Sequence, residues 1–309
     1  MTATHLALVG PTASGKSQLA LDLARALGDL EIVSVDSMQV YRRLDIGTAK
    51  PTAAERAAVP HHLVDVADPS EDWSVARFQA AARDAVTDIE ARGHRALLVG
   101  GTGLYVQAVV DDLRFPGEDL ELRAGLEGRT SEPGGVAAAY AELSERDPDA
   151  AARIDPHNAR RIVRALEVIR LTGKPFSSFG PGVGVFGPTA FPVRLAGIWL
   201  PRPVLADRIE SRFAAMQEAG LLDEVRGLAG SNGGLSRTAR QAIGYKELLA
   251  HLEGAEPSVE AAFETAVRRT RSFARRQRMW FRRDPRITWY GAGENPASIL
   301  PALLASWSR

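Results

Sequence analysis

The sequence predicts an α/β protein: a P-loop-type doubly wound parallel sheet flanked by helices, with an all-helical insertion domain. Strand-like and helix-like segments alternate as far as residue 113, a rhythm typical of doubly wound sheets. A phosphate-loop motif lies between the first strand and the first helix. From residue 119 to residue 172 the pattern is helical only. We therefore assign a core to residues 1–113 and 196–309 and the insertion to residues 114–195, because 309 residues suit one or two lobes.

The first part of the chain supplies most of the predicted sheet. Leu6–Val9 is an apolar run that ends at Gly10-Pro11, which indicates a buried parallel strand. Apolar residues then recur at helical spacing over Lys16–Leu27, and Gly28 follows as an end signal. By the same patterns we expect strands at Glu31–Val35, Leu63–Val66 and Ala96–Val99, and a helix at Val75–Ala91.

The second part of the chain is mostly helical. A turn at Phe115-Pro116-Gly117 ends the alternation, and Phe176–Pro192 is a loop-like stretch rich in glycine and proline. A strand-like run resumes at Val193–Leu200. After it we expect only helices, at Val204–Ala219, Ala239–Leu252 and Val259–Arg283.

Composition excludes several classes of protein. The 38 basic and 38 acidic residues cancel, so no overall charge excess indicates a nucleic-acid or membrane partner. Without cysteine the chain has no disulfide, no thiol nucleophile and no cysteine-based zinc site. The six histidines form no metal-binding pattern. Because we find no secretory signal and no apolar run long enough to span a bilayer, we expect a cytoplasmic protein with no membrane partner.

The phosphate-loop motif G-x-x-x-x-G-K-[ST] is matched by Gly10, Pro11, Thr12, Ala13, Ser14, Gly15, Lys16 and Ser17. Its glycines let backbone amides point inward, and the positive end of the helix dipole adds to them. We expect Lys16 to contact the terminal phosphates and Ser17 to bind Mg²⁺ through its hydroxyl. Nucleotide-binding and ATP-binding proteins use this motif, but it specifies only a polyphosphate or a diphosphate. A chance glycine loop is the alternative.

The acidic residue expected near this loop is in an unusual place. P-loop NTPases usually carry an aspartate at a strand end to hold Mg²⁺, but Ala96–Val99 runs into Gly100-Gly101-Thr102. The acid at a strand end is instead Asp36. Because ligands bind at the carboxyl ends of parallel strands, Asp36 should face the phosphate loop. The alternative is an aspartate that only caps a helix or turn.

Basic residues concentrate near the C-terminus. The segment from Val267 to Arg286 contains nine arginines and only one acidic residue, Asp284. Phe273, Trp280 and Phe281 could pack inward from the same helix while the arginines face RNA phosphates. A solvated basic helix is the alternative, since charge runs are often exposed helix faces. A second cluster, Arg160, Arg161 and Arg164, lies on a predicted helix of the insertion.

Several motifs together resemble the bacterial type of tRNA dimethylallyltransferase, also called tRNA isopentenyltransferase. They follow the family order over nearly the whole chain, and Asp-Ile-Gly-Thr-Ala-Lys-Pro at residues 45–51 is the most specific of them. The others are the phosphate loop, Val-Asp-Ser-Met-Gln-Val-Tyr at 35–41, Val-Gly-Gly-Thr-Gly-Leu-Tyr at 99–105, Arg-Ile-Val-Arg-Ala-Leu-Glu-Val at 161–168 and Gly-Tyr-Lys at 244–246.

The resemblance implies a reaction and its catalytic residues. The family transfers a dimethylallyl group from dimethylallyl diphosphate to the N6 amine of the adenine immediately 3′ of the anticodon in certain tRNAs. The phosphate loop would hold the diphosphate leaving group, with Mg²⁺ as cofactor. Asp36 would be the general base on N6, Arg212 a further cation on the leaving group, and Thr12 and Thr102 would lie near the reacting groups.

The resemblance also implies a tRNA-binding surface, since the partner is the tRNA anticodon stem-loop. The tRNA contacts it implies are Asp36, Ser37, Met38, Gln39, Thr102, Arg123, Arg160, Arg161, Arg164, Arg271, Arg275, Arg276, Gln277 and Arg278. The chain departs from the family at Phe273, where a tyrosine is usual, and at Arg160, where glutamine is frequent. We expect the protein to be a monomer.

Three other functions are compatible with parts of the sequence. A P-loop small-molecule kinase would share the loop, the sheet and the size. A prenyltransferase that acts on free adenine nucleotides would share the loop and Asp36 but would not need the basic clusters. A non-catalytic nucleic-acid binder could keep the loop, although the presence of Lys16, Ser17, Asp36 and Arg212 together argues against it.

Overall fold

The computed structural model describes residues 4–180, 182–231 and 233–307. The chain divides into two compact units, which we call the core unit (Met1–Asp112 with Phe186–Arg309) and the insertion unit (Leu113–Val185). The insertion unit thus ends earlier than the insertion expected at 114–195. Residues 193–195 belong to the core unit because they already pair with β1 in its sheet.

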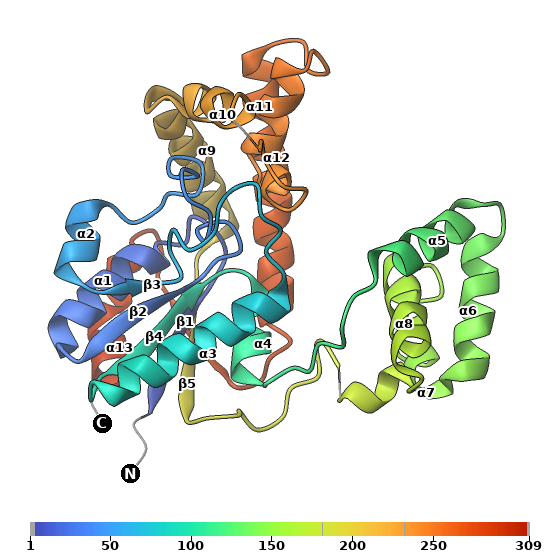
Figure 1. Ribbon diagram of the computed structural model, residues 1–309. Coiled ribbons are helices and arrows are strands. Elements are labelled where there is room, and N and C mark those ends of the chain that lie inside the picture. The colour runs from blue at the N-terminus through green and yellow to red at the C-terminus, as the bar shows by residue number, and fades with distance from the viewer. Residues whose placement is uncertain (1–3, 181, 232, 308–309) are drawn as a thin grey trace. The chain divides into compact units, whose positions relative to one another are not determined.

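A six-stranded sheet forms the middle of the core unit (Figure 1). Its strands are β1 (His5–Val9), β2 (Leu30–Val35), β3 (His61–His62), β4 (Arg95–Gly100), β5 (Val193–Trp199) and β6 (Ile287–Gly291). They lie in the order β3-β2-β4-β1-β5-β6, and every neighbouring pair is parallel. All residues of β1 and β2 are buried, as expected of parallel strands with both faces covered. The predicted fold class is therefore confirmed.

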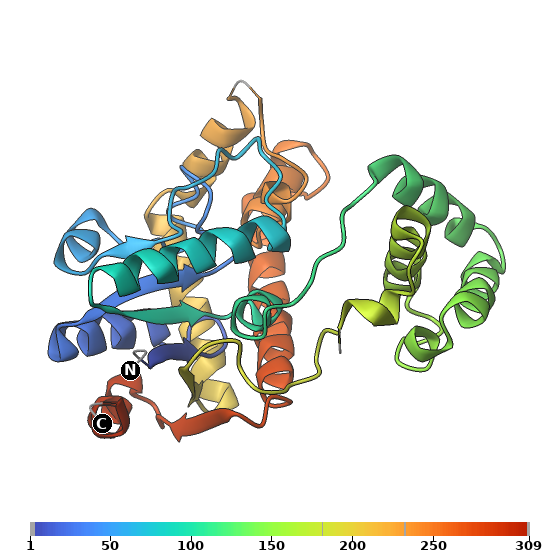
Figure 2. The same cartoon turned by 60° about the horizontal axis from the view of Figure 1, so that its bottom comes forward.

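Helices cover both faces of the sheet. The chain passes from β1 to β2 through α1 (Lys16–Leu27), and α3 (Val75–Ala91) leads back towards β4 after the short helix α2 (Ala53–Ala58). These two crossovers run in opposite directions across the sheet. Right-handed connections therefore place α1 and α3 on opposite faces (Figures 1 and 2). Both α1 and α3 have the predicted bounds.

Helices that follow β4 and β5 complete the core unit. They are α4 (Gly103–Val110), α9 (Arg202–Glu218), α10 (Leu221–Ala229), α11 (Tyr245–Leu252), α12 (Val259–Phe281) and α13 (Leu300–Trp307). The helices predicted at Val204–Ala219 and Val259–Arg283 are confirmed as α9 and α12, which pack against each other. No helix among the described residues is both long enough and apolar enough to cross a membrane.

Three features of the core unit differ from the prediction. The strand expected at Leu63–Val66 is wrong: β3 ends at His62, and Leu63 has a φ of 62°, a left-handed conformation that a strand cannot contain. The single helix expected at Ala239–Leu252 is also wrong, because Gly244 has a φ of 95° and α11 begins only after it. The edge strand β6 lies in a segment where the sequence predicts only helices.

All regular secondary structure among the described residues of the insertion unit is helical, as predicted. It contains α5 (Leu120–Ser131), α6 (Gly135–Arg146), α7 (Pro148–Ala151) and α8 (Ala159–Thr172), followed by a short 3₁₀ helix at Phe176–Phe179. Leu126, Leu143, Ile162 and Leu166 belong to a hydrophobic core of its own. Since this core is separate from that of the sheet, the unit has the internal packing of an independent domain.

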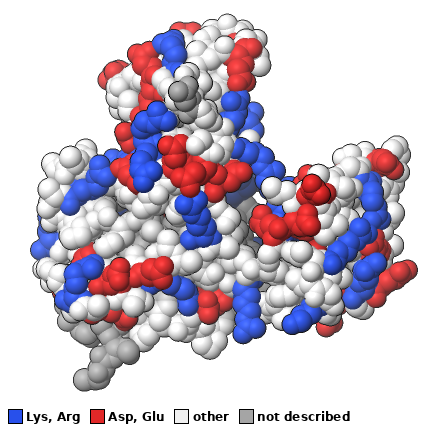
Figure 3. All heavy atoms as spheres, viewed as in Figure 1, with Lys and Arg blue, Asp and Glu red and all other residues white. Residues whose placement is uncertain are grey.

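Surface charges are mixed. On the face seen in Figure 3, basic and acidic side chains are interspersed over the core unit, in agreement with the zero net charge of the chain. Among the described residues Glu31 is one of the buried charged side chains, and Arg92, His62 and His94 contact its carboxylate.

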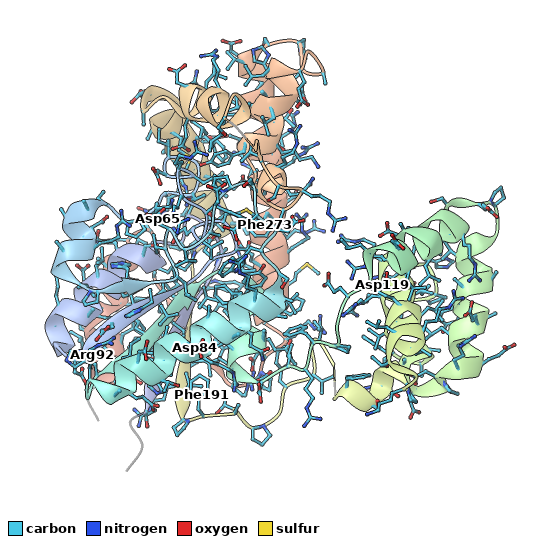
Figure 4. The ribbon with its side chains drawn as sticks, viewed as in Figure 1. Asp65, Asp84, Arg92, Asp119, Phe191 and Phe273 are labelled. Carbon is cyan, nitrogen blue, oxygen red and sulfur yellow. The ribbon has the colours of Figure 1, made fainter. Side chains whose placement is uncertain are left out.

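Glu31 lies at the start of β2, at the end of the sheet opposite the phosphate loop. Its side chain is 4% exposed and accepts hydrogen bonds from Arg92 at 2.7 and 3.0 Å. Arg92 follows the last turn of α3 (Figure 4). His62 and His94 contact the same carboxylate at 2.7 and 2.8 Å. The bonds from Arg92, with those from the two histidines, hold the pKa of Glu31 at about 2 although burial acts to raise it.

We expect Glu31 to make stability depend on acid pH. Because its folded-state pKa of about 2 lies below the ordinary value of 4.5, its contribution is fully present above about pH 5 and is lost as the pH falls towards 2. Glu31→Gln should lower the free energy of unfolding at pH 7 by roughly 2–3 kcal/mol, and the difference from wild type should shrink below pH 4.5. Urea unfolding at pH 7, 4 and 3 measures it, with the exposed Glu264→Gln as control. If Glu31→Gln and wild type differed in free energy of unfolding by the same amount at all three pH values, the difference would not come from the ionisation of Glu31.

Candidate active site

Three loops meet at the carboxyl edge of the sheet. In the sheet β4 lies between β1 and β2, and Gly100 at its end pairs with both Val9 and Val35. The three strands therefore end level with one another. The residues that follow them, Gly10, Asp36 and Gly101, begin neighbouring loops, as the sequence predicts for Asp36 and the phosphate loop.

The phosphate loop between β1 and α1 has the conformation that its glycines allow. Gly15 has a φ of 84°, and a Cβ there would lie 2.7 Å from Pro296. Ala13 is also left-handed, with a φ of 60°. Ser14 is buried, and its Oγ has no hydrogen-bond partner among the described residues. A buried hydroxyl without a partner is costly, so the loop is suited to receive an acceptor such as a phosphate oxygen.

Two cations approach this loop from different elements. Lys16 Nζ donates to the carbonyl of Pro11 at 3.3 Å, and Arg212 of α9 donates to Thr12 Oγ1 at 3.2 Å. Burial lowers the pKa of Lys16 to about 8; Asp36 opposes this shift and Arg212 adds to it. Burial also lowers the pKa of Arg212, again opposed by Asp36. Among the described residues neither cation has a carboxylate within ion-pair distance, so a bound anion would stabilise both.

Asp36 lies opposite these cations and is fixed by its own turn. Its Oδ1 accepts hydrogen bonds from the backbone N–H of Met38 at 2.8 Å and of Gln39 at 3.4 Å. Asp36 therefore does stabilise a turn, which was the alternative to a catalytic role, but the turn occupies only one of its carboxylate oxygens. No described residue donates to Oδ2. The carboxylate is thus held rigidly, with one oxygen available to accept a proton or a hydrogen bond.

Ser37, Met38 and Gln39 form the turn that carries Asp36. All three are partly exposed. Gln39 is held by Ser34, whose Oγ donates to Gln39 Oε1 at 2.7 Å, and its Nε2 donates to the carbonyl of Thr48 at 3.1 Å. Thr102 directly precedes α4 as its N-cap residue, and its side chain makes no capping bond. Ser37–Gln39 and Thr102 thus belong to the loops that follow the neighbouring strands β2 and β4.

Gln277, which the resemblance implies as a tRNA contact, lies in the interior of the core unit. It projects from α12 into the core unit and is 6% exposed. Its Oε1 accepts from the N–H of Thr12 at 2.8 Å, and its Nε2 donates to the carbonyl of Gly101 at 2.8 Å. A Cβ at Gly101 would overlap this amide, which explains the glycine. Both ends of the side chain are used, so Gln277 joins the phosphate loop to the turn that carries Thr102.

The Asp-Ile-Gly-Thr-Ala-Lys-Pro segment at 45–51 is held by buried polar contacts. Lys50 is 3% exposed and bonds Asp45 and Asp65 at 2.6 Å each. Glu224 of α10 accepts from the N–H of Ile46 at 2.8 Å and from the Tyr245 hydroxyl at 2.5 Å. This network involves two of the sequence motifs, because Tyr245 belongs to Gly-Tyr-Lys. A cavity of about 810 Å³ lies beside the segment and is bordered by Arg212.

The four arginines of the insertion unit that are expected to contact tRNA divide into two groups. Arg123 bonds the buried Glu167 at 3.0 and 3.1 Å. Arg164 lies 2.9 Å from the same carboxylate and donates to the carbonyl of Pro116 at 2.6 Å. These two expected tRNA contacts are therefore engaged within the fold. Arg160 and Arg161 are exposed at the start of α8 and remain available to a partner.

The arginines of α12 also differ in their surroundings. Arg275 and Arg276 are exposed. Arg271 forms an ion pair with Glu210 of α9, and the guanidinium of Arg278 lies 3.8 Å from the ring centroid of Trp199. Phe273, where the family usually has tyrosine, is partly buried beside Arg276 (Figure 4).

One contact to the phosphate loop was not assigned from sequence. Arg208 Nε donates to the carbonyl of Ala13 at 2.8 Å. The available signal was the spacing of Arg208 and Arg212, four residues apart on one helix, which also describes an ordinary solvated face. The side chains of both residues reach the loop from α9.

Comparison with known proteins agrees with this geometry. The profile of the family described as IPP transferase matches residues 39–284, and that described as isopentenyl transferase matches residues 3–63. A tRNA dimethylallyltransferase of Kineococcus radiotolerans is 49% identical over 306 residues, 97% of this chain and 95% of the relative. One of Roseiflexus castenholzii is 52% identical over 290 residues, 91% of this chain and 90% of the relative.

Solved structures give the same result. The tRNA isopentenylpyrophosphate transferase of Bacillus halodurans superposes with a TM-score of 0.71 at 40% identity, covering 99% of this chain and 97% of that one. A eukaryotic dimethylallyltransferase acting on tRNA has a TM-score of 0.78 at 28% identity, covering 98% of this chain and 77% of that one. Since the family profile, the sequences and the fold agree over nearly the full length, this chain belongs to the tRNA dimethylallyltransferase family.

Proposed function

We propose that this enzyme transfers the dimethylallyl group of dimethylallyl diphosphate to the N6 amine of the adenine immediately 3′ of the anticodon in a subset of tRNAs. The observation that carries the proposal is the placement of Asp36 opposite the phosphate loop with two partly buried cations, Lys16 and Arg212, whose pKa values burial lowers. A carboxylate facing a site for a leaving anion is what alkylation of a weakly nucleophilic amine requires.

The reaction joins N6 to C1 of the allylic group while the bond from C1 to the diphosphate oxygen breaks. The adenine N6 amine is a poor nucleophile because its lone pair is delocalised into the ring. The electrophile must therefore ionise readily, and this depends on stabilising the negative charge that grows on the diphosphate. Lys16 and Arg212 supply fixed positive charge, and amides of the loop supply donors. Thr12 N–H is not among these donors because it bonds Gln277.

Asp36 accepts the N6 proton. Its Oδ1 is held by the Met38 amide, which fixes the carboxylate and leaves Oδ2 to accept the proton. The base must leave the anticodon stack to reach this position. Ser37, Met38, Gln39 and Thr102 lie on the loops that follow β2 and β4, next to the phosphate loop, and we assign them to holding the adenine.

Mg²⁺ fits the donors of the loop. Ser17 is exposed in the first turn of α1, and Mg²⁺ commonly takes few protein ligands together with substrate phosphates and water. Among the described residues no cluster of three acidic or histidine side chains offers a complete protein cage. When bound, Mg²⁺ would neutralise charge on the diphosphate oxygens.

The proposed function also implies a tRNA partner and a cellular location. The exposed Arg160, Arg161, Arg275 and Arg276 are suited to tRNA phosphates, whereas Arg123 and Arg164 are occupied by Glu167. We propose a monomeric enzyme that meets the anticodon stem-loop in the cytoplasm. A kinase or an enzyme for free adenine nucleotides would have no use for the basic residues of α8 and α12.

The direct test is nucleoside analysis by mass spectrometry. Unmodified tRNA incubated with the enzyme, dimethylallyl diphosphate and Mg²⁺ should yield N6-dimethylallyladenosine at the position 3′ of the anticodon. Parallel reactions with AMP as acceptor, and with [³²P]ATP in place of the allylic diphosphate, should give no product. Transfer of phosphate from ATP, or prenylation of AMP with tRNA unmodified, would overturn the proposal.

We expect Gln277 to affect turnover more than tRNA affinity. Gln277→Glu keeps the acceptor for Thr12 N–H but sets a carboxylate oxygen against the carbonyl of Gly101, so the two loops should separate. A misplacement of this kind can cost up to about 10²-fold in turnover. Steady-state kinetics and tRNA affinity should be compared with Ser272→Ala, an exposed position of the same helix. If Gln277→Glu weakened only tRNA affinity and left turnover unchanged, Gln277 would be a tRNA contact and not a residue that positions the loops.

A further inference from the structure

Glu224, in the first turn of α10, is a half-buried carboxylate that is bound by neutral donors. Its Oε2 accepts hydrogen bonds from the backbone N–H groups of Asp45 at 3.1 Å and Ile46 at 2.8 Å. Its Oε1 accepts from the N–H of Gly47 at 3.4 Å and from the Tyr245 hydroxyl at 2.5 Å. Among the described residues no cation lies within ion-pair distance of this carboxylate. Three successive amides and a hydroxyl therefore hold its charge, as in the backbone concavities that bind anions.

Tyr245 closes this contact from the other side. It is fully buried at the start of α11, and burial together with the charge of Glu224 raises the pKa of its hydroxyl, which therefore stays protonated and donates. The same hydroxyl accepts from the N–H of Gly47 at 3.2 Å. A Cβ at Gly47 would lie 2.4 Å from the ring, so only glycine allows this approach.

The segment 45–51 is folded tightly on itself, so a shift at its start would be carried along it. The N–H of Ala49 bonds the carbonyl of Ile46, and the N–H of Lys50 bonds the carbonyl of Asp45, at 3.0 Å each. Ala49 is left-handed, with a φ of 47°. A residue other than glycine keeps such a conformation only where its surroundings fix it. The three amides held by Glu224 are part of those surroundings.

The far side of this segment holds the turn that carries Asp36. The carbonyls of Thr48 and Ala49 both accept from Gln39 Nε2, at 3.1 and 3.3 Å. The backbone N–H of Gln39 in turn bonds Asp36 Oδ1 at 3.4 Å. Hydrogen bonds and short stretches of backbone therefore connect Glu224 to Asp36 without a gap.

Glu224 itself has no part in the phosphate loop. All of its hydrogen bonds go to the segment 45–51 and to Tyr245, whereas Lys16 and Arg212 bond residues of the loop. Loss of the Glu224 carboxylate should therefore disturb the orientation of Asp36 and leave the binding of the diphosphate unchanged.

We propose that Glu224 is a positioning residue for the transfer reaction: it anchors the segment 45–51 and, through Gln39, sets the orientation of the Asp36 carboxylate. The use of Asp36 as the base rests on the proposed function, whereas the connection from Glu224 to the Asp36 turn does not. Tyr245 completes the anchor. The close packing of Gly47 on this tyrosine gives a physical reason for the glycine of the Asp-Ile-Gly-Thr-Ala-Lys-Pro motif.

The test is a double-variant cycle in the full chain. Glu224→Ala removes the anchor, and Glu224→Gln keeps its size but replaces one acceptor oxygen by an amino group. Asp223→Ala is the control, because it removes a carboxylate that is 78% exposed on the same turn of α10. Each change is made alone and together with Asp36→Asn. Single-turnover rates at saturating tRNA and dimethylallyl diphosphate, the affinity for the diphosphate, and backbone hydrogen exchange by mass spectrometry are measured.

We expect Glu224→Ala alone to lower the rate by roughly 10–10²-fold, since a small misplacement of a reacting group can cost this much. Glu224→Gln should have a smaller effect in the same direction. Combined with Asp36→Asn, either change should cost no more than about twofold, because the carboxylate that it misaligns is already absent. Diphosphate affinity should match that of Asp223→Ala. Hydrogen exchange should become faster at the amides of residues 45–47 and also at those of residues 38 and 39.

Equal rate losses with and without Asp36→Asn would show that Glu224 acts independently of Asp36, and the proposal would be wrong. Faster exchange confined to residues 45–47 would refute it as well, since the Asp36 turn would then not depend on the anchor. Should Glu224→Ala not fold, Glu224→Gln provides the same two comparisons. If the wild type prenylates no tRNA, the proposed function fails, and hydrogen exchange alone decides whether Glu224 holds the Asp36 turn.

Discussion

Replacing Asp36 by asparagine should lower the single-turnover rate of prenyl transfer by roughly 10²–10⁴-fold, the usual cost of losing a general base. Asparagine keeps a side-chain oxygen that can accept from the Met38 amide, so the turn should persist. It removes the basic oxygen on which the N6 proton is expected to arrive. Because the change leaves the exposed arginines untouched, tRNA affinity should stay within a few-fold of wild type.

Asp36→Ala is the matched variant that separates the two roles of this residue. It removes both the base and the acceptor of the Met38 and Gln39 amides, so any further loss beyond Asp36→Asn measures the contribution of the turn. Rapid-quench measurements with saturating tRNA and dimethylallyl diphosphate give the rates. Near wild-type turnover in Asp36→Asn would show that another group takes the proton.

Lys16→Ala and Arg212→Ala should each lower kcat by roughly 10²–10³-fold and also raise the KM for dimethylallyl diphosphate. Both cations are expected to contact charge that is larger on the departing diphosphate than on the bound substrate, so the loss should not be confined to binding. Arg25→Ala, at an exposed position of α1, serves as control. An effect of Arg212→Ala only on tRNA affinity would reassign this residue to the RNA surface.

The same lysine gives a pH dependence. The pKa of Lys16 is about 8, lowered chiefly by burial, so its positive charge is present below pH 8 and is lost as the pH rises through that value. Because kcat/KM reports the free enzyme, it should fall above about pH 8 for wild type. Lys16→Arg should remove this fall, since an arginine stays charged over the whole range. Persistence of the fall in Lys16→Arg would assign it to another group.

Local patterns in the sequence were sufficient for the fold class. Strand Leu6–Val9, helix Lys16–Leu27 and helix Val75–Ala91 were each predictable because their apolar periodicity and end signals lie within the element itself. Where the conformation depends on a few backbone angles, the prediction failed. Leu63 and Gly244 adopt positive φ values that no periodicity reports, and they displaced one expected strand and divided one expected helix.

The doubly wound sheet, the phosphate loop, the helical insertion and the position of Asp36 at a strand end could all be predicted from the sequence, since each is encoded in contiguous residues. Which polar side chains serve the fold, and which remain available to substrates, depends on contacts between distant segments and becomes visible only in the folded chain. Gln277 bonds Thr12 across 265 residues of chain, and Glu167 engages Arg123 from another helix. Charge and residue type are readable from sequence, but the partner that neutralises a charge is chosen by packing between distant segments.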